Sequence, residues 1–516
     1  MAISLSVHIR GSGGEVRRFA LTVLAAIVAL TVAAPVAQAA PSPDYRPPPV
    51  AWGPCPKAPL AGRAECGFVT APLDYARPGG EQIKIAVSRV KHKVADAKAQ
   101  GPMLVNPGGP GGAGRSLALL GGSVPKHAGD AYDWIGFDPR GVGASKPALS
   151  CVPDYGGYNR PEYDPAKAPG VVAAWQARAE RYAAACAKKG GALLSHLTTA
   201  DAAKDLDTIR KALGAKQINF YGFSYGTYLG QVYATLFPQN LRRAVFDGVV
   251  DHRGVWYQSN LDQDVAFQKA IEVYFDWIAK NDAVYHLGNS GDAVEKRYYA
   301  ERDKLRAAPA GGKIGPSEWT DIFLQAGYYV SGWEKIASTF AKWVQKRDAA
   351  ALVALYDDTA SIGDDNGYAI YLAVQCTDTP WPQPFARVLA DNTRVAATAP
   401  FETWGNAWYN APCQTWKAPA RQPVEISGAA APPVLLISET LDAATPYSGA
   451  LEARRVFGKS ALIEGVGGTT HAGSLSGVAC TDNAIAAYLA DGTLPARVAG
   501  DRSDKRCPAV PQPDPN

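Results

Sequence analysis

The sequence carries little excess charge of either sign: its 52 lysines and arginines nearly balance its 48 aspartates and glutamates, which leaves +4. So small an excess argues against a nucleic-acid surface or a polybasic membrane patch. No stretch after residue 39 is long and apolar enough to span a bilayer. No CxxC pair offers zinc ligands either. We therefore expect no nucleic acid, no metal and no cofactor.

The first 39 residues combine the features of a secretory signal peptide. Arginines precede an apolar run over residues 19–34, and a small-residue Ala-Gln-Ala sequence ends at Ala39. The run is shorter than the roughly 20 residues that a membrane anchor needs. We expect cleavage after this segment, export by the Sec or twin-arginine route, and a secreted mature protein with no stable membrane insertion.

Eight cysteines fit an oxidising compartment, where an even number indicates disulfides. Eight cysteines allow 105 connectivities, so the sequence leaves the pairing open. We expect neighbours along the chain to pair. The expected pairs are Cys55 with Cys66, Cys151 with Cys186, Cys376 with Cys413, and Cys480 with Cys507.

Short apolar runs bounded by glycine and proline alternate with helical periodicity over residues 52–251. Strands that alternate with helices indicate a mostly parallel sheet with helices on both faces. The expected strands are 82–89, 102–106, 132–138, 218–222 and 243–248, and the expected helices are 171–188 and 198–213.

The composition changes over residues 253–428, which hold nine of the twelve tryptophans and no comparable apolar strand. Helical stretches at 262–280 and 333–346 indicate a helical cap inserted after the sixth core strand. Strand patterns return at 432–438 and 460–465, before a helix over 480–489 and a tail from 502 held by Cys507. The expected domains are a signal peptide (1–39), an α/β core in two parts (40–252 and 429–516) and the cap (253–428).

A Gly-x-Ser-x-Gly motif, Gly222-Phe-Ser224-Tyr225-Gly226, lies between an expected strand and an expected helix. In that context the motif forms a sharp turn that exposes the serine hydroxyl. A buried serine in a glycine-rich turn is the structural alternative. We expect Ser224 to be a nucleophile and the backbone N–H of Tyr225 to be one oxyanion donor.

A glycine-rich stretch, Asn106-Pro-Gly108-Gly109-Pro-Gly-Gly, follows an expected strand. Glycines let a backbone approach the substrate, so we expect Gly108 or Gly109 to supply the second oxyanion N–H. A phosphate loop is a poor alternative, because the stretch does not end in Gly-Lys-Ser or Gly-Lys-Thr and its prolines lack N–H donors. We expect Asp138 and Arg140, after the next strand, to form an ion pair that supports this loop.

A serine nucleophile needs a base and an acid that orients the base, in the chain order Ser, Asp or Glu, His for this fold. Asp442 and His471 each follow an expected strand, where parallel sheets build their sites. Glu439, Asp247 and Asp251 are alternatives for the acid, and an exposed surface histidine is the structural alternative for His471. We prefer Asp442 because its loop leads toward the strand before His471.

Together these motifs resemble those of the secreted tripeptidyl aminopeptidases of actinobacteria, in the prolyl-aminopeptidase group of α/β-hydrolases. The similarity covers most of the chain and includes two cap motifs, Cys376-Thr-Asp-Thr-Pro-Trp381 and Cys413-Gln-Thr-Trp416. It implies an α/β-hydrolase fold with a family-specific C-terminal region. It also implies a nucleophile at Ser224, an acid at Asp442, a base at His471, and release of short peptides, often tripeptides, from free N-termini.

Such an enzyme must recognise an ammonium group, which favours an acidic residue under the cap. The same machinery also acts on esters or lactones, because a fold does not fix a substrate. The alternatives are therefore a carboxylesterase or lactone hydrolase and, in another class, a non-catalytic exported binding protein. The cap offers Asp264, Glu272, Asp276, Asp378, Glu402 and other acids, and the sequence does not single out one of them.

Overall fold

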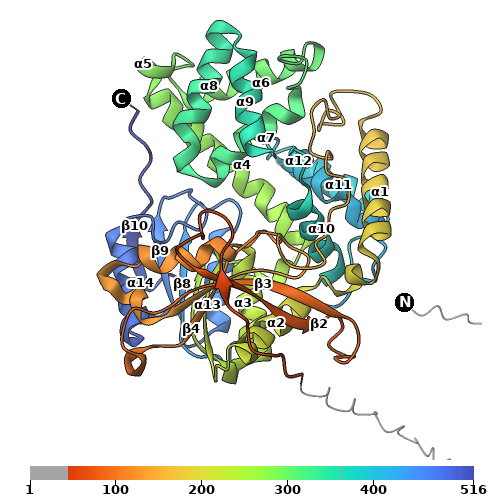
Figure 1. Cartoon of the computed structure of the whole chain (residues 1–516). Coiled ribbons are helices and arrows are strands. Elements are labelled where there is room, and N and C mark those ends of the chain that lie inside the picture. Colours follow the sequence, from red (N-terminus) through yellow and green to blue (C-terminus); the bar gives the residue numbers. More distant parts are fainter. Residues whose placement is uncertain (1–44, 361, 516) are drawn as a thin grey trace, which may run out of the picture. The chain divides into compact units, whose positions relative to one another are not determined.

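The computed structural model describes residues 45–360 and 362–515, so the expected signal peptide over 1–39 lies outside the described residues. Ten strands of the described chain form one sheet in the order β1-β2-β3-β5-β4-β6-β7-β8-β9-β10 (Figure 1). Neighbouring strands from β1 to β5 in this order are antiparallel, and every neighbouring pair from β5 to β10 is parallel. This mostly parallel sheet, with helices on both faces, confirms the expected α/β-hydrolase fold.

The helices and strands have the following bounds, and the longest interruption of the sheet lies between β7 and β8. The strands are β1 (Gly53–Pro54), β2 (Glu65–Pro72), β3 (Gln82–Val90), β4 (Pro102–Asn106), β5 (Asp133–Asp138), β6 (Ile218–Phe223), β7 (Leu241–Asp247), β8 (Val434–Glu439), β9 (Ala461–Val466) and β10 (Lys505–Pro508). The α-helices before β8 are α1 (Val171–Gly190), α2 (Thr199–Ala212), α3 (Tyr225–Leu236), α4 (Tyr257–Lys280), α5 (Asp282–Tyr285), α6 (Gly291–Ala307), α7 (Pro316–Tyr328), α8 (Trp333–Lys346), α9 (Ala349–Thr359), α10 (Asn366–Asp378), α11 (Phe385–Ala396) and α12 (Thr403–Asn410). After β8 come α13 (Tyr447–Val456) and α14 (Ala479–Asp491).

Alternate residues of the central strands enter two different hydrophobic cores, one on each face of the sheet. Ile218 and Phe220 of β6 pack with residues of α1, α2, α3 and α13 on one face. Tyr221, the residue after Phe220, packs with Ile485 and Leu489 of α14 on the other. This period of two explains why the strands read as continuous apolar runs, since both faces are covered.

Between β7 and β8 the chain forms α4 to α12, which lie outside the sheet (Figure 1). Much of this insertion has its own aromatic core, which includes the fully buried Trp319 and Trp333. Helix α10 is different, because Ala369 and Ile370 join the core of the sheet. We refer to α4–α12 as the cap, and α10 anchors it to the sheet.

Three strands were not expected from the sequence: the two-residue β1, β2 and β10. In β2, Phe68 is 42% exposed while the next residue, Val69, is fully buried. Apolar residues therefore occur on both faces of the strand, and the sequence lacks the alternation of apolar and polar residues that indicates a strand. The expected tail from 502 contains β10, which lies parallel to β9. Beyond β10 the backbone N–H of Val510 donates to Glu439 at 3.1 Å.

The structure joins each cysteine to its expected neighbour, Cys55 to Cys66, Cys151 to Cys186, Cys376 to Cys413 and Cys480 to Cys507. The last bond ties β10 to α14. Among residues 45–360 and 362–515, every helix is too short or too polar to cross a bilayer.

Candidate active site

Ser224 lies in the tight turn between β6 and α3. Its backbone φ of +56° is in the left-handed region that residues other than glycine rarely adopt. Hydrogen bonds hold this conformation: the Ser224 N–H donates to the Asp247 carbonyl at 2.9 Å, and the Thr227 N–H and hydroxyl donate to the Ser224 carbonyl at 2.8 and 2.7 Å. A Cβ at Gly222 would lie 2.4 Å from the Gly226 carbonyl oxygen, so this turn requires glycine.

Asp442 and His471 are brought together by the loops that follow β8 and β9. The two Asp442 carboxylate oxygens lie 3.0 and 2.9 Å from Nδ1 of His471. The same carboxylate accepts the backbone N–H groups of Ala444 and Thr445 at 3.0 Å each and the Thr445 hydroxyl at 2.9 Å. An acceptor so fixed holds the imidazole proton on Nδ1 and leaves Nε2 as the basic nitrogen.

The second nitrogen of His471 is available for chemistry. Nε2 is buried and has no hydrogen-bond partner among the described residues, and the ring lines the same cavity as Ser224. Burial lowers the pKa of His471, but the charge and hydrogen bond of Asp442 outweigh burial and leave the pKa above its ordinary value. The arrangement can therefore take a proton from a group in the cavity and keep the resulting imidazolium next to a carboxylate.

The other candidate acids have different partners. Asp247 accepts a backbone N–H at 2.8 Å, and burial raises its pKa to about 6. Burial raises the pKa of Glu439 to about 7, and one of its oxygens has no partner among the described residues. Asp251 pairs with Arg253 at 2.6 Å. Asp442 is thus the carboxylate that the structure places against His471.

The glycine-rich loop after β4 lies directly against Ser224. A Cβ at Gly108, whose φ is +95°, would lie 2.8 Å from the Ser224 Cβ. The N–H of Gly108 donates to the Asn106 side chain at 3.0 Å. Gly109 is exposed, lines the cavity, and its N–H has no hydrogen-bond partner among the described residues. Tyr225 is the first residue of α3, so its N–H has no partner within the helix.

The expected ion pair between Asp138 and Arg140 is wrong. Arg140 is buried and pairs with Asp205 of α2 at 2.6 Å, because a buried guanidinium needs a carboxylate in bidentate geometry. Asp138 instead pairs with Arg115 at 3.0 Å and accepts the backbone N–H of Gly114 at 3.0 Å. Asp138 therefore orders the end of the glycine-rich loop without Arg140.

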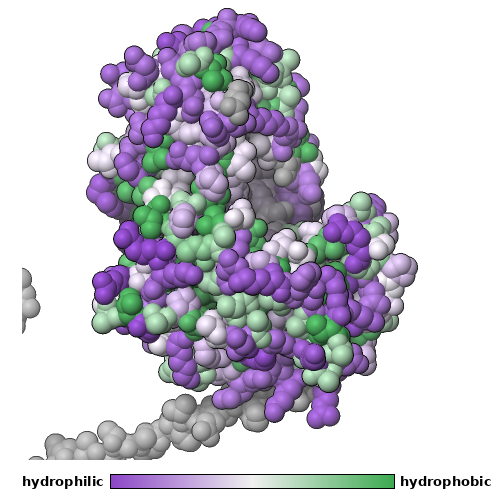
Figure 2. Space-filling view, turned by 90° about the vertical axis from the view of Figure 1, so that its left-hand side faces the viewer, coloured by the Kyte–Doolittle hydropathy of each residue, from purple (hydrophilic) through white to green (hydrophobic). Residues whose placement is uncertain are grey.

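Ser224, His471 and Gly109 open on a cavity of about 810 Å³ between the sheet and the cap. This is large enough for a ligand the size of a short peptide. Figure 2 shows a hollowed face on which hydrophobic and hydrophilic residues are interspersed. The lining is rich in aromatic side chains, which include Tyr163, Tyr328, Tyr329, Tyr371, Trp408 and Tyr409.

The cap contacts the loops that carry Asp442 and His471. The backbone N–H of His471 donates to the carbonyl of Tyr328, at the end of α7, at 2.8 Å. The Gln263 side chain of α4 donates to the Ala444 carbonyl at 2.5 Å. Helices of the cap thus hold both loops in place, a role that periodicity alone gave no sign of.

Of the five cap acids named from the sequence, Glu402 is the one that lines the cavity. Asp264 is buried and accepts a hydrogen bond from Asn406 at 2.8 Å. Asp378 is buried and accepts the Thr199 hydroxyl at 2.6 Å. Glu272 and Asp276 are not among the lining residues.

Among the charged residues of the cavity wall that the sequence did not single out are Arg160 and Asp321. They pair at 2.6 Å, and Arg160 also pairs with Glu318 at 3.0 Å. The Tyr163 hydroxyl donates to Asp321 at 2.9 Å. A charged residue on a helix or in a loop usually lies in solvent, so no local pattern marked these residues.

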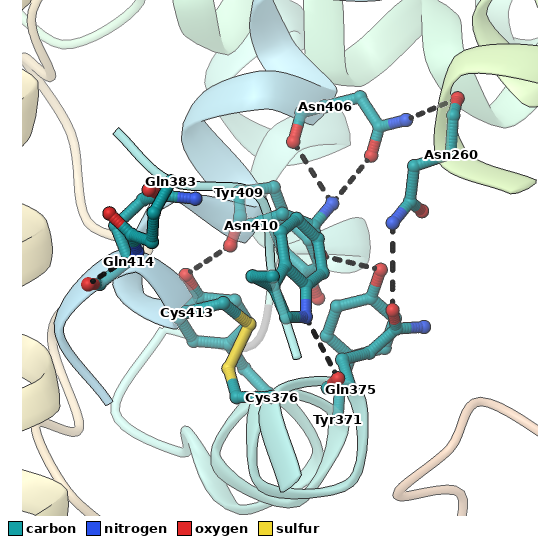
Figure 3. Close-up of a disulfide and its surroundings, with 12 residues drawn as sticks. Asn260, Tyr371, Gln375, Cys376, Gln383, Asn406, Tyr409, Asn410, Cys413 and Gln414 are labelled. Carbon is teal, nitrogen blue, oxygen red and sulfur yellow. Dashed lines mark hydrogen bonds between the residues drawn. A yellow bond between two sulfur atoms is a disulfide. The ribbon is translucent and has the colours of Figure 1, made fainter. Parts of the chain in front are cut away.

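The Cys376–Cys413 disulfide joins α10 to the short helix at Ala411–Thr415 (Figure 3). Beside it, the side chain of Asn410 donates to the carbonyl and side-chain oxygens of Asn406 at 3.0 and 2.9 Å. The Tyr371 hydroxyl of α10 donates to Asn410 at 3.0 Å. The disulfide that joins the two cap motifs thus lies next to the end of α12, which Tyr371 also contacts.

Within the described residues, no group of three histidine, cysteine or acidic side chains could hold a metal ion. The groups that the structure does gather are those of a serine hydrolase: a serine in a tight turn, a histidine–carboxylate pair, and two unpaired backbone N–H groups at one cavity.

Comparison with known proteins gives consistent findings. Residues 399–507 match the family described as TAP-like protein. The chain is 42% identical over 448 residues to the tripeptidyl aminopeptidase of Streptomyces lividans, which covers 84% of this chain and 82% of that protein. It is 32% identical over 474 residues to serine protease Hip1 of Mycobacterium tuberculosis, covering 87% and 90%.

A third relative has a different name. Carboxylesterase B of Mycobacterium tuberculosis is 32% identical over 455 residues, covering 84% of this chain and 85% of that protein. Among solved structures, the proline iminopeptidase of Mycobacterium smegmatis has a TM-score of 0.39 and 15% identity, covering 82% of this chain and 97% of that one.

Proposed function

The chain belongs to the tripeptidyl aminopeptidase family of α/β-hydrolases and is a serine peptidase, and from this premise we propose that it releases tripeptides from free N-termini. One observation carries the proposal. A histidine whose Nδ1 is held by Asp442 lines the same cavity as Ser224, with its Nε2 free of any described partner. The non-catalytic alternative has no support from such relatives.

In the proposed acylation step, Nε2 of His471 takes the hydroxyl proton of Ser224 as Oγ attacks the carbonyl carbon of the scissile bond. The oxyanion accepts hydrogen bonds from the N–H groups of Tyr225 and Gly109. We choose Gly109 over Gly108 because the Gly108 N–H is already donated to Asn106. The intermediate then collapses, and the His471 imidazolium gives its proton to the departing amine.

The second half of the cycle releases the N-terminal fragment. The acyl group is now held as an ester on Ser224 Oγ, and the leaving peptide has made room for water. His471 takes a proton from this water as it attacks the ester carbonyl. The same N–H groups bind the second oxyanion, and collapse returns the proton to Ser224 and frees a carboxylic acid. Asp442 stabilises the imidazolium in both halves.

We also propose that the enzyme acts outside the cell. The expected signal peptide over 1–39 would direct export, and the four disulfides suit an oxidising compartment. Its substrates would then be peptides in the surroundings of the cell.

The proposal is tested with purified mature protein and three substrates: trialanine 4-nitroanilide, its N-acetylated counterpart and 4-nitrophenyl acetate. We expect rapid cleavage of the free tripeptide amide and little of the acetylated one. Ser224→Ala should abolish both amide and ester turnover. Its thermal melting curve should match that of the wild type, which would show that the variant is folded. Cleavage of the amide by the folded Ser224→Ala variant would contradict the mechanism.

A carboxylesterase is the second candidate function, since one relative has that name and the cavity lining is rich in aromatic side chains. The same assay distinguishes the two. Turnover of 4-nitrophenyl acetate without turnover of either amide would assign an esterase and leave the Ser224, Asp442 and His471 roles unchanged.

A further inference from the structure

Five carboxylates line the cavity; three of them have hydrogen-bond or ion-pair partners that compensate them, and a fourth is exposed to solvent. Asp251 and Asp321 form ion pairs at 2.6 Å, with Arg253 and Arg160. The remaining two are Asp364, which is exposed, and Asp365, which accepts hydrogen bonds from Ser150, Cys151, Val152 and Tyr182.

The fifth carboxylate, Glu402, is not satisfied by the protein. The residue is 7% exposed, and its Oε2 is buried with no hydrogen-bond partner among the described residues. No ion pair with Glu402 occurs within the described chain. Glu402 precedes the first residue of α12, but its side chain makes no capping hydrogen bond there, so helix capping does not account for it.

We propose that Glu402 binds the α-ammonium group of the peptide substrate. The inference rests on the proposed aminopeptidase function and names the residue that would read the free N-terminus. An ammonium group is compact and carries three N–H donors, which suits a single carboxylate that lacks partners. The aromatic wall offers additional stabilisation of a cation through ring faces.

The electrostatic surroundings favour a cation at this point. Burial raises the pKa of Glu402 well above its ordinary value, and the charges of Asp321 and Asp264 raise it further, while Arg160 opposes them. Arg160 is already shared between Asp321 and Glu318. A carboxylate left in this state is costly for the empty protein, and an arriving ammonium group would relieve that cost.

Space for the ligand comes from a glycine. Gly405 lies on the first turns of α12 and lines the cavity, and a Cβ there would lie 3.2 Å from each Glu402 oxygen. Glycine is otherwise unfavourable inside a helix. The helix itself is fixed, since the Asn406 side chain donates to the Asn260 carbonyl at 3.1 Å (Figure 3) and also donates to Asp264 at 2.8 Å.

The test compares two variants of this site with a matched control, using the three substrates named above. Glu402→Gln keeps the shape and removes the charge. Gly405→Ala keeps the charge, places a methyl group against both oxygens, and is favoured by the helix, so it serves if the first variant fails to fold. Asp364→Asn is the control, because Asp364 lines the same cavity but is exposed.

We expect Glu402→Gln to lower kcat/KM for trialanine 4-nitroanilide by at least about 30-fold, mainly through KM, as loss of a buried charge pair does. Turnover of 4-nitrophenyl acetate should change by less than about twofold, since the ester has no ammonium group. Gly405→Ala should act in the same direction, and Asp364→Asn should leave the preference for the free over the acetylated amide unchanged.

The possible failures are distinguishable. If the wild type prefers the free amide and Glu402→Gln and Gly405→Ala both retain that preference, the role of Glu402 is wrong and the proposed function stands. If the wild type cleaves the acetylated amide as readily as the free one, both proposals are overturned. A loss of preference in Asp364→Asn equal to that in Glu402→Gln would also overturn the assignment to Glu402.

Discussion

At the sheet end of the cavity, the Asp442 carboxylate accepts hydrogen bonds from Ala444, Thr445 and His471, so groups of the chain itself compensate its charge. At the cap end, Glu402 has an oxygen with no partner among the described residues. A satisfied carboxylate can orient its neighbours before any ligand arrives. An unsatisfied one gains most when a cation binds. In the proposed roles, the sheet end of the cavity carries out the chemistry and the cap end binds the ammonium group of the ligand.

The largest expected effect comes from breaking the sheet end. Asp442→Asn should reduce kcat/KM by about 10,000-fold on amide and ester alike, because the amide no longer holds the His471 proton on Nδ1. Asp442 raises the pKa of His471, and the base must be neutral. In the variant that pKa falls, so the acid limb of residual activity should move to lower pH.

A pH profile of kcat/KM measures this shift, with Glu439→Gln as the control for loss of a nearby buried carboxylate. An acid limb that stays in place in Asp442→Asn would show that another group sets the pKa of the base. An effect on the amide alone would show that Asp442 acts on substrate binding.

A smaller effect is expected from loosening the cap end. Replacing Cys376 and Cys413 by serine opens a loop whose ends are 37 residues apart, which should lower the free energy of unfolding by about 4 kcal/mol. Because this disulfide lies beside α12, KM for the free tripeptide amide should rise more than KM for the ester. Chemical denaturation and the two KM values provide the measurements.

The matched control for the cap disulfide is the Cys480–Cys507 pair, which joins α14 to β10 and closes a separation of 27 residues. Its removal should destabilise the protein comparably and leave the ratio of the two KM values unchanged. If both disulfides alter the ratio equally, the cap end has no special dependence on the Cys376–Cys413 bond.

The smallest effect should come from Glu439, which is near the acid loop but outside the proposed chemistry. Burial raises its folded pKa to about 7 from an ordinary 4.5, so the folded state binds the proton more tightly than the unfolded state. Stability should therefore fall as pH rises from about 4.5 to 7. Glu439→Gln should remove this loss and gain on the order of 2 kcal/mol at pH 8 but little at pH 4.

Melting temperatures of the Glu439→Gln variant and the wild type across this pH range test the linkage. Turnover should stay within about fivefold of the wild type. A variant whose melting temperature tracks the wild type at every pH would show that Glu439 does not carry the pH dependence.

Sequence reasoning succeeded where the information is local. The helix expected at 333–346 has those bounds in the structure, because its apolar residues repeat at helical spacing and face one core. The turn at Ser224 was also predicted from the sequence. Its glycines lie so close to neighbouring backbone atoms that a larger residue would not fit, so the motif itself indicates the turn.

Contacts between distant segments were less accessible. Arg140 pairs with Asp205, 65 residues away, and not with Asp138 two residues before it. Strand β10 is four residues long and finds its place only against β9. Glu402 was one of many acids in the cap, and only the fold shows that it lies on the cavity wall. Each of these depends on the assembled sheet and cap.

The cap is inserted between β7 and β8, so the chain reaches Ser224 long before it reaches Asp442 and His471. During synthesis, Ser224 therefore emerges before the proposed base and the proposed acid. The acid and the base arrive on the last segments to be made, and they meet only when β8 and β9 join the sheet beside β7. If the proposed roles hold, a chain that ends before His471 would have no hydrolytic activity.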